Sequence, residues 1–523
     1  MKARRIEFIH LIVLAIVCIA AFSYTFNPKL DLNGDNARYI ELARNMAHGM
    51  GYATEGTTGE MVPHSHFPIG YPAILSILVT VGLDNLIAFK ILNLFLLIGA
   101  VLMLYSIVKK HTGNDRLALC IGILVAVTPQ ILKFAVMAMS ETTFMFFMIL
   151  SLFALSQAGD GKKEYDVYFW TAAIAAAYCY YLRAVGAAVI FAVLVFYLFR
   201  KEWKKAITST AVSAVCILPW FLRNKALGVG RNYISPILAK NPWRPEEGMI
   251  SSFGEFMQKI WKNLDDTTLS GYRYILFPNW QNYLDGQTTA FRIILGIILV
   301  AIVIWGIWKT GRMRYALLAL MIANTGFILI WNGNNDVRYV TPFVPFVVLG
   351  FWNGIFNILE PAVRKLGKSS VKYLPYAFLL MLFVMKMPLK DAHEKGKEPL
   401  PEPYTQYYFI AESLNAQFDA GNKPVVCCRK PELWKYYAPN TISVSYPFTD
   451  NSRQLIQKLY DDNVSYVILD NLGYASTYLY LLPAINDHSD LFEIVYSAEG
   501  KETNTYLLFF DREKVRNFLQ TNN

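Results

Sequence analysis

Charged residues are scarce in this sequence. Only 17% of its 523 residues are Asp, Glu, Lys or Arg, whereas a soluble chain of this size carries about 25%. Hydrophobic residues make up 54%, and apolar segments long enough to cross about 30 Å of hydrocarbon recur along the chain. The composition therefore excludes an ordinary soluble globular protein and predicts a polytopic α-helical membrane protein.

Cysteine is scarce as well, and the six that occur imply no disulfide framework. Cys427 and Cys428 are adjacent, a spacing that suits neither a usual disulfide nor a metal site. The other four lie inside apolar segments, where we expect small core residues: Cys18, Cys120, Cys179 and Cys216.

The net charge of +10 raises the question of nucleic acid as a partner. Lys and Arg gather in short turns between apolar segments, as at Lys109-Lys110, and membrane orientation explains that pattern better. The expected partner is the lipid bilayer, and no nucleic acid is expected.

Apolar segments and basic turns together predict eleven spans. Lys2, Arg4 and Arg5 precede the first span, which lacks a clear signal-peptide cleavage site, so we expect it to remain, with a cytoplasmic N-terminus. Residues 69–81 are too short to cross and are expected to form a re-entrant or interfacial helix. The predicted spans are residues 6–24, 86–108, 117–132, 142–155, 167–182, 184–198, 206–222, 290–308, 315–331, 340–359 and 373–387, with a long external loop at 223–287.

The composition changes at about residue 388, where polar residues and proline become frequent. We therefore expect a transmembrane domain at residues 1–388 and a soluble extracytoplasmic α/β domain at residues 389–523. This second domain contains no Gly-rich phosphate loop, nucleophile elbow or metal-ligand spacing. A structural or acceptor-docking role is the simplest expectation for it. Its expected helices are 404–418 and 452–461, and its expected strands are 424–429, 465–470, 492–497 and 505–510.

The first external loop, residues 26–68, is too polar for the bilayer although apolar segments flank it. It contains Asp31 and Asp35, a helix-like run at 36–48, a Gly-rich stretch at 49–59, and two histidines, His64 and His66. Loops that carry ionisable groups at a membrane surface are where polytopic proteins concentrate their chemistry.

Several other ionisable and polar residues are predicted to lie at the same external ends of the spans. Charge so close to hydrocarbon is costly unless it lines a wet cavity or is paired. Two carboxylates among several cations suit an anionic, membrane-borne substrate such as a lipid phosphate. Alternatively, each cation is a snorkelling anchor, and Glu141 is a helix cap. These residues are Asp35, Lys90, Glu141, Arg183, Arg223, Asn224, Arg338 and Tyr339.

Six motifs in a fixed order resemble a known family, the clan-C integral membrane glycosyltransferases. They are GDNARYIELARNMAHGMGY, FPIGYP, SETTF, YLRAVG, PWFLRN and RYVTPFVP, spread over about residues 1–345. The chain most resembles the branch of the protein O-mannosyltransferases and the lipid A aminoarabinose transferase. Asp35, Arg38 and Tyr39 match the DE-x-RY pattern of the latter, with Asn36 in place of its second acid.

The resemblance implies transfer of a sugar from a polyprenyl-phosphate donor, with the site facing the periplasm or the ER lumen. Of these two, the external face of the inner (plasma) membrane is expected. Asp35 is then the general base of an inverting displacement, Glu141 the second acidic residue, and Arg38 and Tyr39 part of the substrate site. Lys90, Arg183, Arg223 and Arg338 would stabilise the departing phosphate. The list of implied acceptors comprises a glycolipid, a cell-envelope polymer and a protein. The family also implies a divalent metal near the first loop, with His66 as a candidate ligand; the residues themselves establish no cofactor.

Two other functions are alternatives to an enzyme. The first is a transporter or flippase of lipid-linked sugars, a class that often shows internal repeats and mid-membrane helix breaks. The second is a non-catalytic scaffold. The chain shows no convincing repeat and keeps acidic residues in both external loops, at Asp35 and Glu141, so an enzyme is expected.

Overall fold

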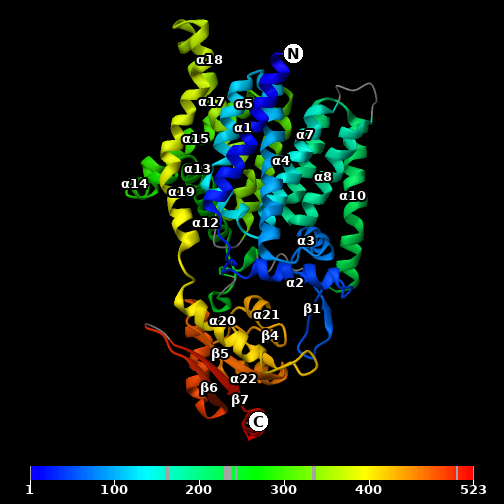
Figure 1. The fold of residues 1–523 in the computed structure, drawn as a ribbon, viewed down its shortest axis with the longest axis vertical. Coiled ribbons are helices and arrows are strands. Elements are labelled where there is room, and N and C mark those ends of the chain that lie inside the picture. The colour runs from blue at the N-terminus through cyan, green and yellow to red at the C-terminus, as the bar shows by residue number, and fades with distance from the viewer. Residues whose placement is uncertain are drawn as a thin grey trace.

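Helices dominate the computed structural model, which describes residues 2–158, 165–228, 237–241, 244–331, 337–501 and 504–521. The helices of the N-terminal part form an upright bundle, and the C-terminal residues form a sheet with its own helices below one end of the bundle (Figure 1). The N-terminus lies at the far end of the bundle from that sheet. The two ends of the bundle therefore have different surroundings.

Each predicted span falls on helical residues, although the predicted span 117–132 covers two helices, α5 and α6, and the predicted span 373–387 covers parts of α18 and α19. Among the described residues, eight helices are long and apolar enough to cross a membrane, or nine if α5 and α6, which meet at a 57° bend, form one span. α8 and α9 are apolar but shorter, so the total of eleven stays a prediction. The bundle helices are α1 (Lys2–Thr25), α4 (Leu86–Thr112), α5 (Asp115–Ala126), α6 (Pro129–Ala135), α7 (Ser140–Gln157), α8 (Val167–Leu182), α9 (Ala187–Phe199), α10 (Trp203–Ala226), α15 (Thr289–Trp308), α16 (Arg314–Ile330), α17 (Val344–Lys365), α18 (Lys368–Ala377) and α19 (Met381–Lys397).

The bundle helices differ in what surrounds them. α1 exposes a row of large apolar side chains, among them Ile12, Ile16 and Ile19. α7 is buried along most of its length, with Phe144 and Met148 fully enclosed. Apolar side chains on the outside of a bundle are favourable only against lipid. α1 therefore faces the bilayer, and α7, which opens with Ser140 and Glu141, occupies the centre of the bundle.

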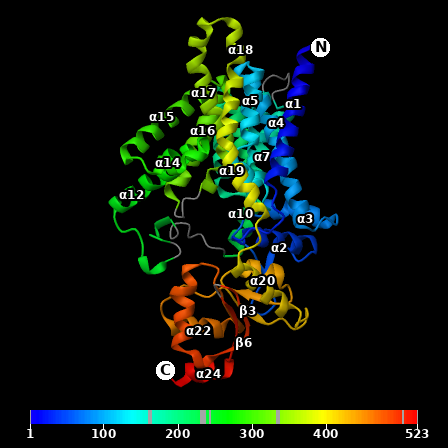
Figure 2. The same cartoon turned by 60° about the vertical axis from the view of Figure 1, so that its left-hand side comes forward.

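Two short helices and a hairpin follow α1 at the lower end of the bundle (Figures 1 and 2). α2 (Asp35–Ala47) lies across that end, and it confirms the helix expected from the first loop. α3 (Gly70–Thr80) has 11 residues, which is too short to cross a bilayer. A hairpin of β1 (Ala53–Glu55) and β2 (Met61–Pro63) lies between them, in the Gly-rich stretch.

The described residues of the connection 223–287 include helices α12 (Phe253–Leu264), α13 (Ser270–Leu276) and α14 (Gln281–Asp285). α12 begins where the Ser252 side chain accepts a hydrogen bond from the Glu255 backbone N–H at 3.1 Å, a normal helix cap. The polar residues of α12 lower its mean hydropathy below that of a membrane span, so the sequence did not mark it as a span. The long connection expected between the spans therefore contains helices that the sequence did not predict.

The C-terminal sheet has five strands in the order β4-β3-β5-β7-β6. β3 pairs in parallel with both β4 and β5, and β7 pairs antiparallel with β5 and β6. The four predicted strands and two predicted helices are confirmed, but β4, α21, α23 and α24 were not foreseen. The elements are α20 (Glu402–Asn415), β3 (Val425–Cys427), α21 (Pro431–Tyr437), β4 (Ile442–Val444), α22 (Ser452–Asp461), β5 (Val464–Leu469), α23 (Leu482–Asp487), β6 (Phe492–Ala498), β7 (Thr505–Phe510) and α24 (Arg512–Thr521).

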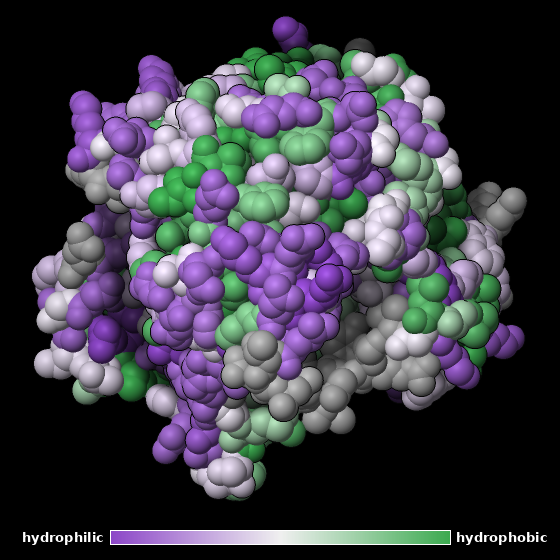
Figure 3. Space-filling model, turned by 90° about the horizontal axis from the view of Figure 1, so that it is seen from below, coloured by the Kyte–Doolittle hydropathy of each residue, from purple (hydrophilic) through white to green (hydrophobic). Residues whose placement is uncertain are grey.

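The C-terminal part is joined to the bundle by packing as well as by the chain. α19 continues through Pro388 to Lys397, so the expected boundary at residue 388 lies inside a helix. Tyr407 of α20 and Trp434 of α21 belong to the same hydrophobic cluster as the bundle helices. The far face of this part, seen from below, is largely hydrophilic (Figure 3). The sheet and its helices therefore pack against the lower end of the bundle, and the polar face of this part lies on the side away from the bundle.

Candidate functional site

Asp35 lies where the first loop turns into α2. It follows Gly34, whose φ of 94° places it in the left-handed region that glycine adopts without strain. Asp35 then occupies the first turn of α2, where the positive end of the helix dipole stabilises a carboxylate. The local sequence Gly-Asp therefore fixes the direction from which this side chain enters the site.

Four of the predicted residues meet in one ion-pair cluster, which joins elements distant in the sequence. Arg338 Nη1 lies 2.8 Å from Asp35 Oδ2, and Arg338 Nε lies 2.5 Å from Glu141 Oε1. Arg183 Nη1 contacts the same Glu141 oxygen at 2.8 Å. We call Asp35, Glu141, Arg183 and Arg338 the acidic-basic cluster.

Burial differs strongly within the acidic-basic cluster. The Glu141 side chain is 0% exposed, whereas that of Asp35 is 28% exposed. A fully buried carboxylate is stable only when cations compensate it, and Arg183 and Arg338 both do so. Asp35 is therefore the carboxylate that a substrate can reach, and Glu141 is the one that holds the two guanidinium groups in place.

Arg338 links the two carboxylates and is itself mostly buried. Burial alone would lower the pKa of Arg338, but the charges of Glu141 and Asp35 raise it above its ordinary value. The guanidinium is thus charged at every accessible pH. A permanently charged, planar donor of this kind suits the oxygens of a phosphate.

Two tyrosines border the acidic-basic cluster. The Tyr39 hydroxyl lies 3.5 Å from Ser140 Oγ, and burial together with the Glu141 charge raises the pKa of Tyr39 to about 12. The Arg183 guanidinium lies 5.8 Å from the centre of the Tyr339 ring, a cation–π distance. The matched positions Tyr39 and Tyr339 therefore both lie at the site that the sequence predicted.

Arg223 lies outside the acidic-basic cluster and stabilises the first loop. It donates hydrogen bonds to the backbone carbonyls of Tyr52 and His64, each at 3.1 Å, and to the Asn224 side chain at 3.1 Å. Its guanidinium also stacks on the rings of Tyr52 and Trp220. The structure thus places Arg223 and Asn224 around the hairpin, not in the acidic-basic cluster.

Lys90 is also held by the first loop. Its Nζ atom donates to the carbonyls of Asn27 and Lys29, each at 2.6 Å, and the residue is 1% exposed. These contacts fix the point at which the chain leaves α1. Lys90 therefore positions the loop. Its ammonium group contacts these carbonyls and is not part of the acidic-basic cluster.

Replacing Lys90 by Met should destabilise the protein by about 2 kcal/mol, because two partly buried carbonyls lose their charged donor. The change is measured as a lower thermal midpoint in detergent. Lys133→Met, at an exposed position of α6, should leave the midpoint unchanged. A Lys90→Met protein as stable as the wild type would show that the loop needs no such anchor.

Arg38 points away from Asp35 although it lies one turn further along α2. It pairs with Glu41 at 2.7 Å and with Glu432 of α21 at 3.3 Å. Near it, Lys430 donates to the carbonyl of Asn33 at 2.8 Å. Arg38 therefore joins the first loop to the C-terminal part, and no local pattern in the sequence predicts this pairing.

A second link between the same parts is made by Glu55 of β1. Lys423 and Lys435 both contact its carboxylate at 2.7 Å. Burial would raise the pKa of Glu55, but the hydrogen bonds and charges of the two lysines hold it below its ordinary value. Glu55 and its partners are 368 and 380 residues apart, so no local signal in the sequence could have paired them.

Glu55→Gln should lower the stability of the folded protein by about 1 kcal/mol at neutral pH, a small value because solvent screens the pair. The folded pKa of Glu55 lies below that of the unfolded chain. Its contribution is therefore full above about pH 4.3 and is lost as the pH falls through the folded pKa. Thermal midpoints of wild type and variant should differ at pH 7 and converge in acid. A difference that persists at low pH would contradict the assignment.

The two histidines of the first loop both contact the Phe67 ring but differ in burial. His64 Nε2 accepts a hydrogen bond from the Phe67 backbone N–H at 3.1 Å, and burial lowers the pKa of His64 to about 3. His66 is exposed. Within the described ranges, no three His, Cys, Asp or Glu side chains converge as metal ligands. His66 thus belongs to no such group of described residues, and the metal stays an expectation of the family resemblance.

Comparison with known proteins gives one family and several similar structures. A family model described as a domain of unknown function (DUF8201) matches residues 79–345. No curated protein matches the chain in sequence. The match includes Glu141, Arg183 and Arg338 and begins after the loop that carries Asp35.

Three solved structures are similar over most of the chain. The oligosaccharyltransferase AglB of Archaeoglobus fulgidus, in complex with an inhibitory peptide and a dolichol-phosphate, is 14% identical with a TM-score of 0.59, over 96% of this chain and 74% of its own. ArnT of Cupriavidus metallidurans, bound to undecaprenyl phosphate, is 12% identical with a TM-score of 0.58, over 95% and 97%. The arabinofuranosyltransferase AftD from mycobacteria is 13% identical with a TM-score of 0.52, over 95% and 40%. The resemblance to clan-C membrane glycosyltransferases is thereby confirmed for the fold.

Proposed function

The chain belongs to the DUF8201 family, and we propose that it is a membrane glycosyltransferase that moves a sugar from a polyprenyl-phosphate donor to an acceptor. The acidic-basic cluster carries this proposal. It combines one reachable carboxylate, Asp35, with two guanidinium groups at the end of the bundle. Glycosyltransferases of similar fold, one bound to a dolichol-phosphate and one to undecaprenyl phosphate, make a lipid phosphate the fitting donor.

Asp35 is the proposed general base. As an ionised carboxylate it can accept the proton of an acceptor hydroxyl or amine while that atom attacks the anomeric carbon. The bond from the anomeric carbon to the phosphate oxygen breaks in the same step, and the phosphate leaves with the electron pair. A single displacement of this kind inverts the configuration of the anomeric carbon.

Arg183 and Arg338 are the proposed phosphate ligands. Negative charge grows on the departing phosphate in the transition state, and fixed cations stabilise that state more than the bound donor. Glu141 holds both guanidinium groups by contacts of 2.8 and 2.5 Å. We assign Glu141 a positioning role in place of direct contact with the substrate, because its side chain is wholly buried.

Lys90, Arg223 and Arg38 act on the first loop in this proposal. Lys90 and Arg223 hold backbone carbonyls at two points of residues 27–64, and Arg38 ties α2 to Glu432. Together they fix the loop that presents Asp35. Positioning of a base to within a fraction of an ångström is worth several kcal/mol of the barrier.

The proposed location is the plasma membrane, with the N-terminus cytoplasmic and the acidic-basic cluster on the opposite side. The C-terminal part packs beside α2, through contacts such as Lys430 with the Asn33 carbonyl. We propose residues 389–523 as the extracytoplasmic part that helps to receive the acceptor, which is a glycolipid, a cell-envelope polymer or a protein.

The test is transfer of labelled sugar by the purified protein in nanodiscs. Short-chain polyprenyl-phosphate sugars serve as donors, and nucleotide sugars with the same labelled sugar serve as controls. Label should move to an acceptor or to water from the lipid donors alone. Transfer from nucleotide sugars would overturn the donor class. Binding of lipid donors without any transfer would favour a transporter.

A further inference from the structure

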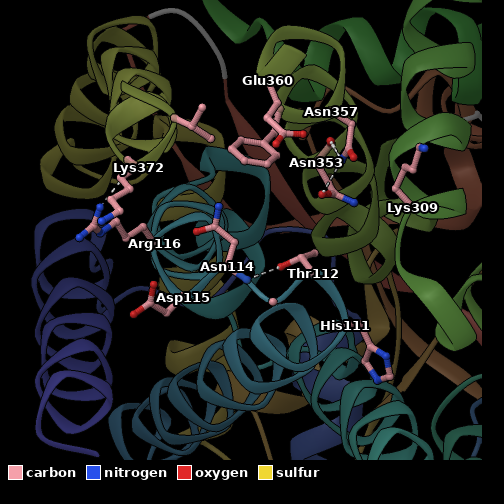
Figure 4. Close-up of a pocket in the computed structure, with 13 residues that line it drawn as sticks. His111, Thr112, Asn114, Asp115, Arg116, Lys309, Asn353, Asn357, Glu360 and Lys372 are labelled. Atoms are coloured by element: carbon pink, nitrogen blue, oxygen red, sulfur yellow. Dashed lines mark hydrogen bonds between the residues drawn. The ribbon is translucent and has the colours of Figure 1, made fainter. Parts of the chain in front are cut away.

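A pocket of about 510 Å³ lies at the end of the bundle opposite to Asp35. α4 starts beside α2, where Asp84 pairs with Arg44, and its 27 residues carry the chain about 40 Å to the other end. The pocket lies there, among the ends of α4, α5, α15, α17 and α18 (Figure 4). It is thus separate from the acidic-basic cluster, and its volume is typical of a ligand site.

Three of the residues that line the pocket are cations: Arg116, Lys309 and Lys372. Arg116 donates to the Lys372 carbonyl at 3.1 Å and makes no ion pair among the described residues. Lys372 and Lys309 are exposed, and Lys309 stacks on Trp305 at 4.4 Å. In Figure 4, Arg116 and Lys372 lie on one side of the pocket and Lys309 lies on the other. Three positive charges therefore surround one space.

Two carboxylates also line the pocket but leave its net charge positive. Glu360 is paired with Arg364 one turn further along α17. Asp115 lies in the first turn of α5, where the helix dipole stabilises it. Neither forms an ion pair with Arg116, Lys309 or Lys372 within the described ranges. An anion therefore remains the complementary ligand.

Amide and apolar groups complete the lining. Asn353 is buried and donates to the Gly306 carbonyl at 2.6 Å, while Asn357 donates to the Asn353 side chain at 3.1 Å. Figure 4 shows these amides and Asn114 between the cations. Phe356 and Val371 form an apolar wall. Such a surface suits a ligand with a phosphate, hydroxyl groups and a hydrocarbon part.

We infer that this pocket binds the headgroup of an anionic phospholipid that carries hydroxyl groups, as phosphatidylglycerol does. The phosphate would lie between Arg116, Lys372 and Lys309, and the hydroxyls would meet the asparagine amides. The exposed Tyr373 ring, 5.5 Å from the Arg116 guanidinium, offers an apolar surface next to that cation. Basic pockets among span ends bind anionic headgroups in this way.

The test is lipid retention by the purified protein, measured by native mass spectrometry after reconstitution with equal phosphatidylglycerol and phosphatidylcholine. The wild type should retain phosphatidylglycerol preferentially. Lys309→Gln should lower that preference about fivefold and the double variant Arg116→Gln/Lys372→Gln about 25-fold, since each cation near an anionic lipid surface contributes a similar increment of free energy. Lys204→Gln, at an exposed position on α10, is the matched control and should keep the preference.

Three outcomes would overturn the inference: no preference in the wild type, an unchanged preference in both pocket variants, or an equal loss in Lys204→Gln. Excess glycerol phosphate distinguishes a lipid site from a site for soluble phosphate esters. It should leave the lipid in place, and displacement of the lipid would assign the pocket to the soluble ester. Lys309→Gln keeps the test decisive if the double variant fails to fold, because Lys309 is exposed.

Discussion

Asp35→Asn should lower kcat for sugar transfer by about 10²- to 10⁴-fold, the usual contribution of a general base. The amide is nearly the same size as the carboxylate but cannot accept the acceptor's proton. Arg338 keeps its 2.5 Å contact with Glu141, so the cations that face the phosphate stay in place. The variant should therefore still bind the donor, with a dissociation constant close to that of the wild type.

The matched control is Asp31→Asn. Asp31 lies in the same loop, where its side chain accepts a hydrogen bond from the Asn33 backbone N–H at 3.0 Å, an interaction that an amide oxygen preserves. This variant should transfer sugar at the wild-type rate. Full activity in Asp35→Asn, or an equal loss in Asp31→Asn, would remove Asp35 from the proposed chemistry.

Glu141→Gln should be the most damaging single change to the site as a whole. Removal of one partner from a buried ion pair costs about 3–5 kcal/mol, and here two guanidinium groups lose the same carboxylate. Arg338 retains Asp35, which places the expected loss of stability near the lower end of that range. The loss is measured as a lower thermal midpoint in detergent.

A positioning role for Glu141 also predicts a kinetic signature. Among the molecules that remain folded, the KM for the lipid donor should rise and kcat should fall, because Arg183 and Arg338 no longer point at the phosphate. A purely structural role would reduce the amount of active protein and leave KM unchanged. Glu394→Gln is the control: its i,i+4 contact with Lys390 is exposed, so it should change neither quantity.

The sequence was most informative about the acidic-basic cluster. Charged residues beside apolar spans are costly unless they are paired, and that rule alone selected Asp35, Glu141, Arg183 and Arg338. It could not separate them from Lys90, which the same rule selected. Lys90 donates its hydrogen bonds to backbone carbonyls of the first loop. Every residue has a backbone carbonyl, so the amino-acid sequence does not show which carbonyl accepts such a bond.

A helix or strand could be predicted from the sequence where it is long enough to show its own hydrophobic pattern. The long apolar helices and strands such as β5 and β7 came from local periodicity and composition. β4 has three residues and α21 has seven, too few for such a pattern. The docking of the C-terminal part, through Glu55 and Arg38, depends on pairs nearly 400 residues apart. Only the tertiary structure brings those side chains together.

The most direct measurement is the mass of the bound donor during a single turnover. Protein loaded with a short-chain polyprenyl-phosphate sugar is mixed with acceptor and followed by native mass spectrometry. We expect the bound lipid to lose the mass of one sugar in the wild type, and to keep it in Asp35→Asn. A donor that stays intact on the wild-type protein, or leaves it unchanged, would contradict sugar transfer at the acidic-basic cluster.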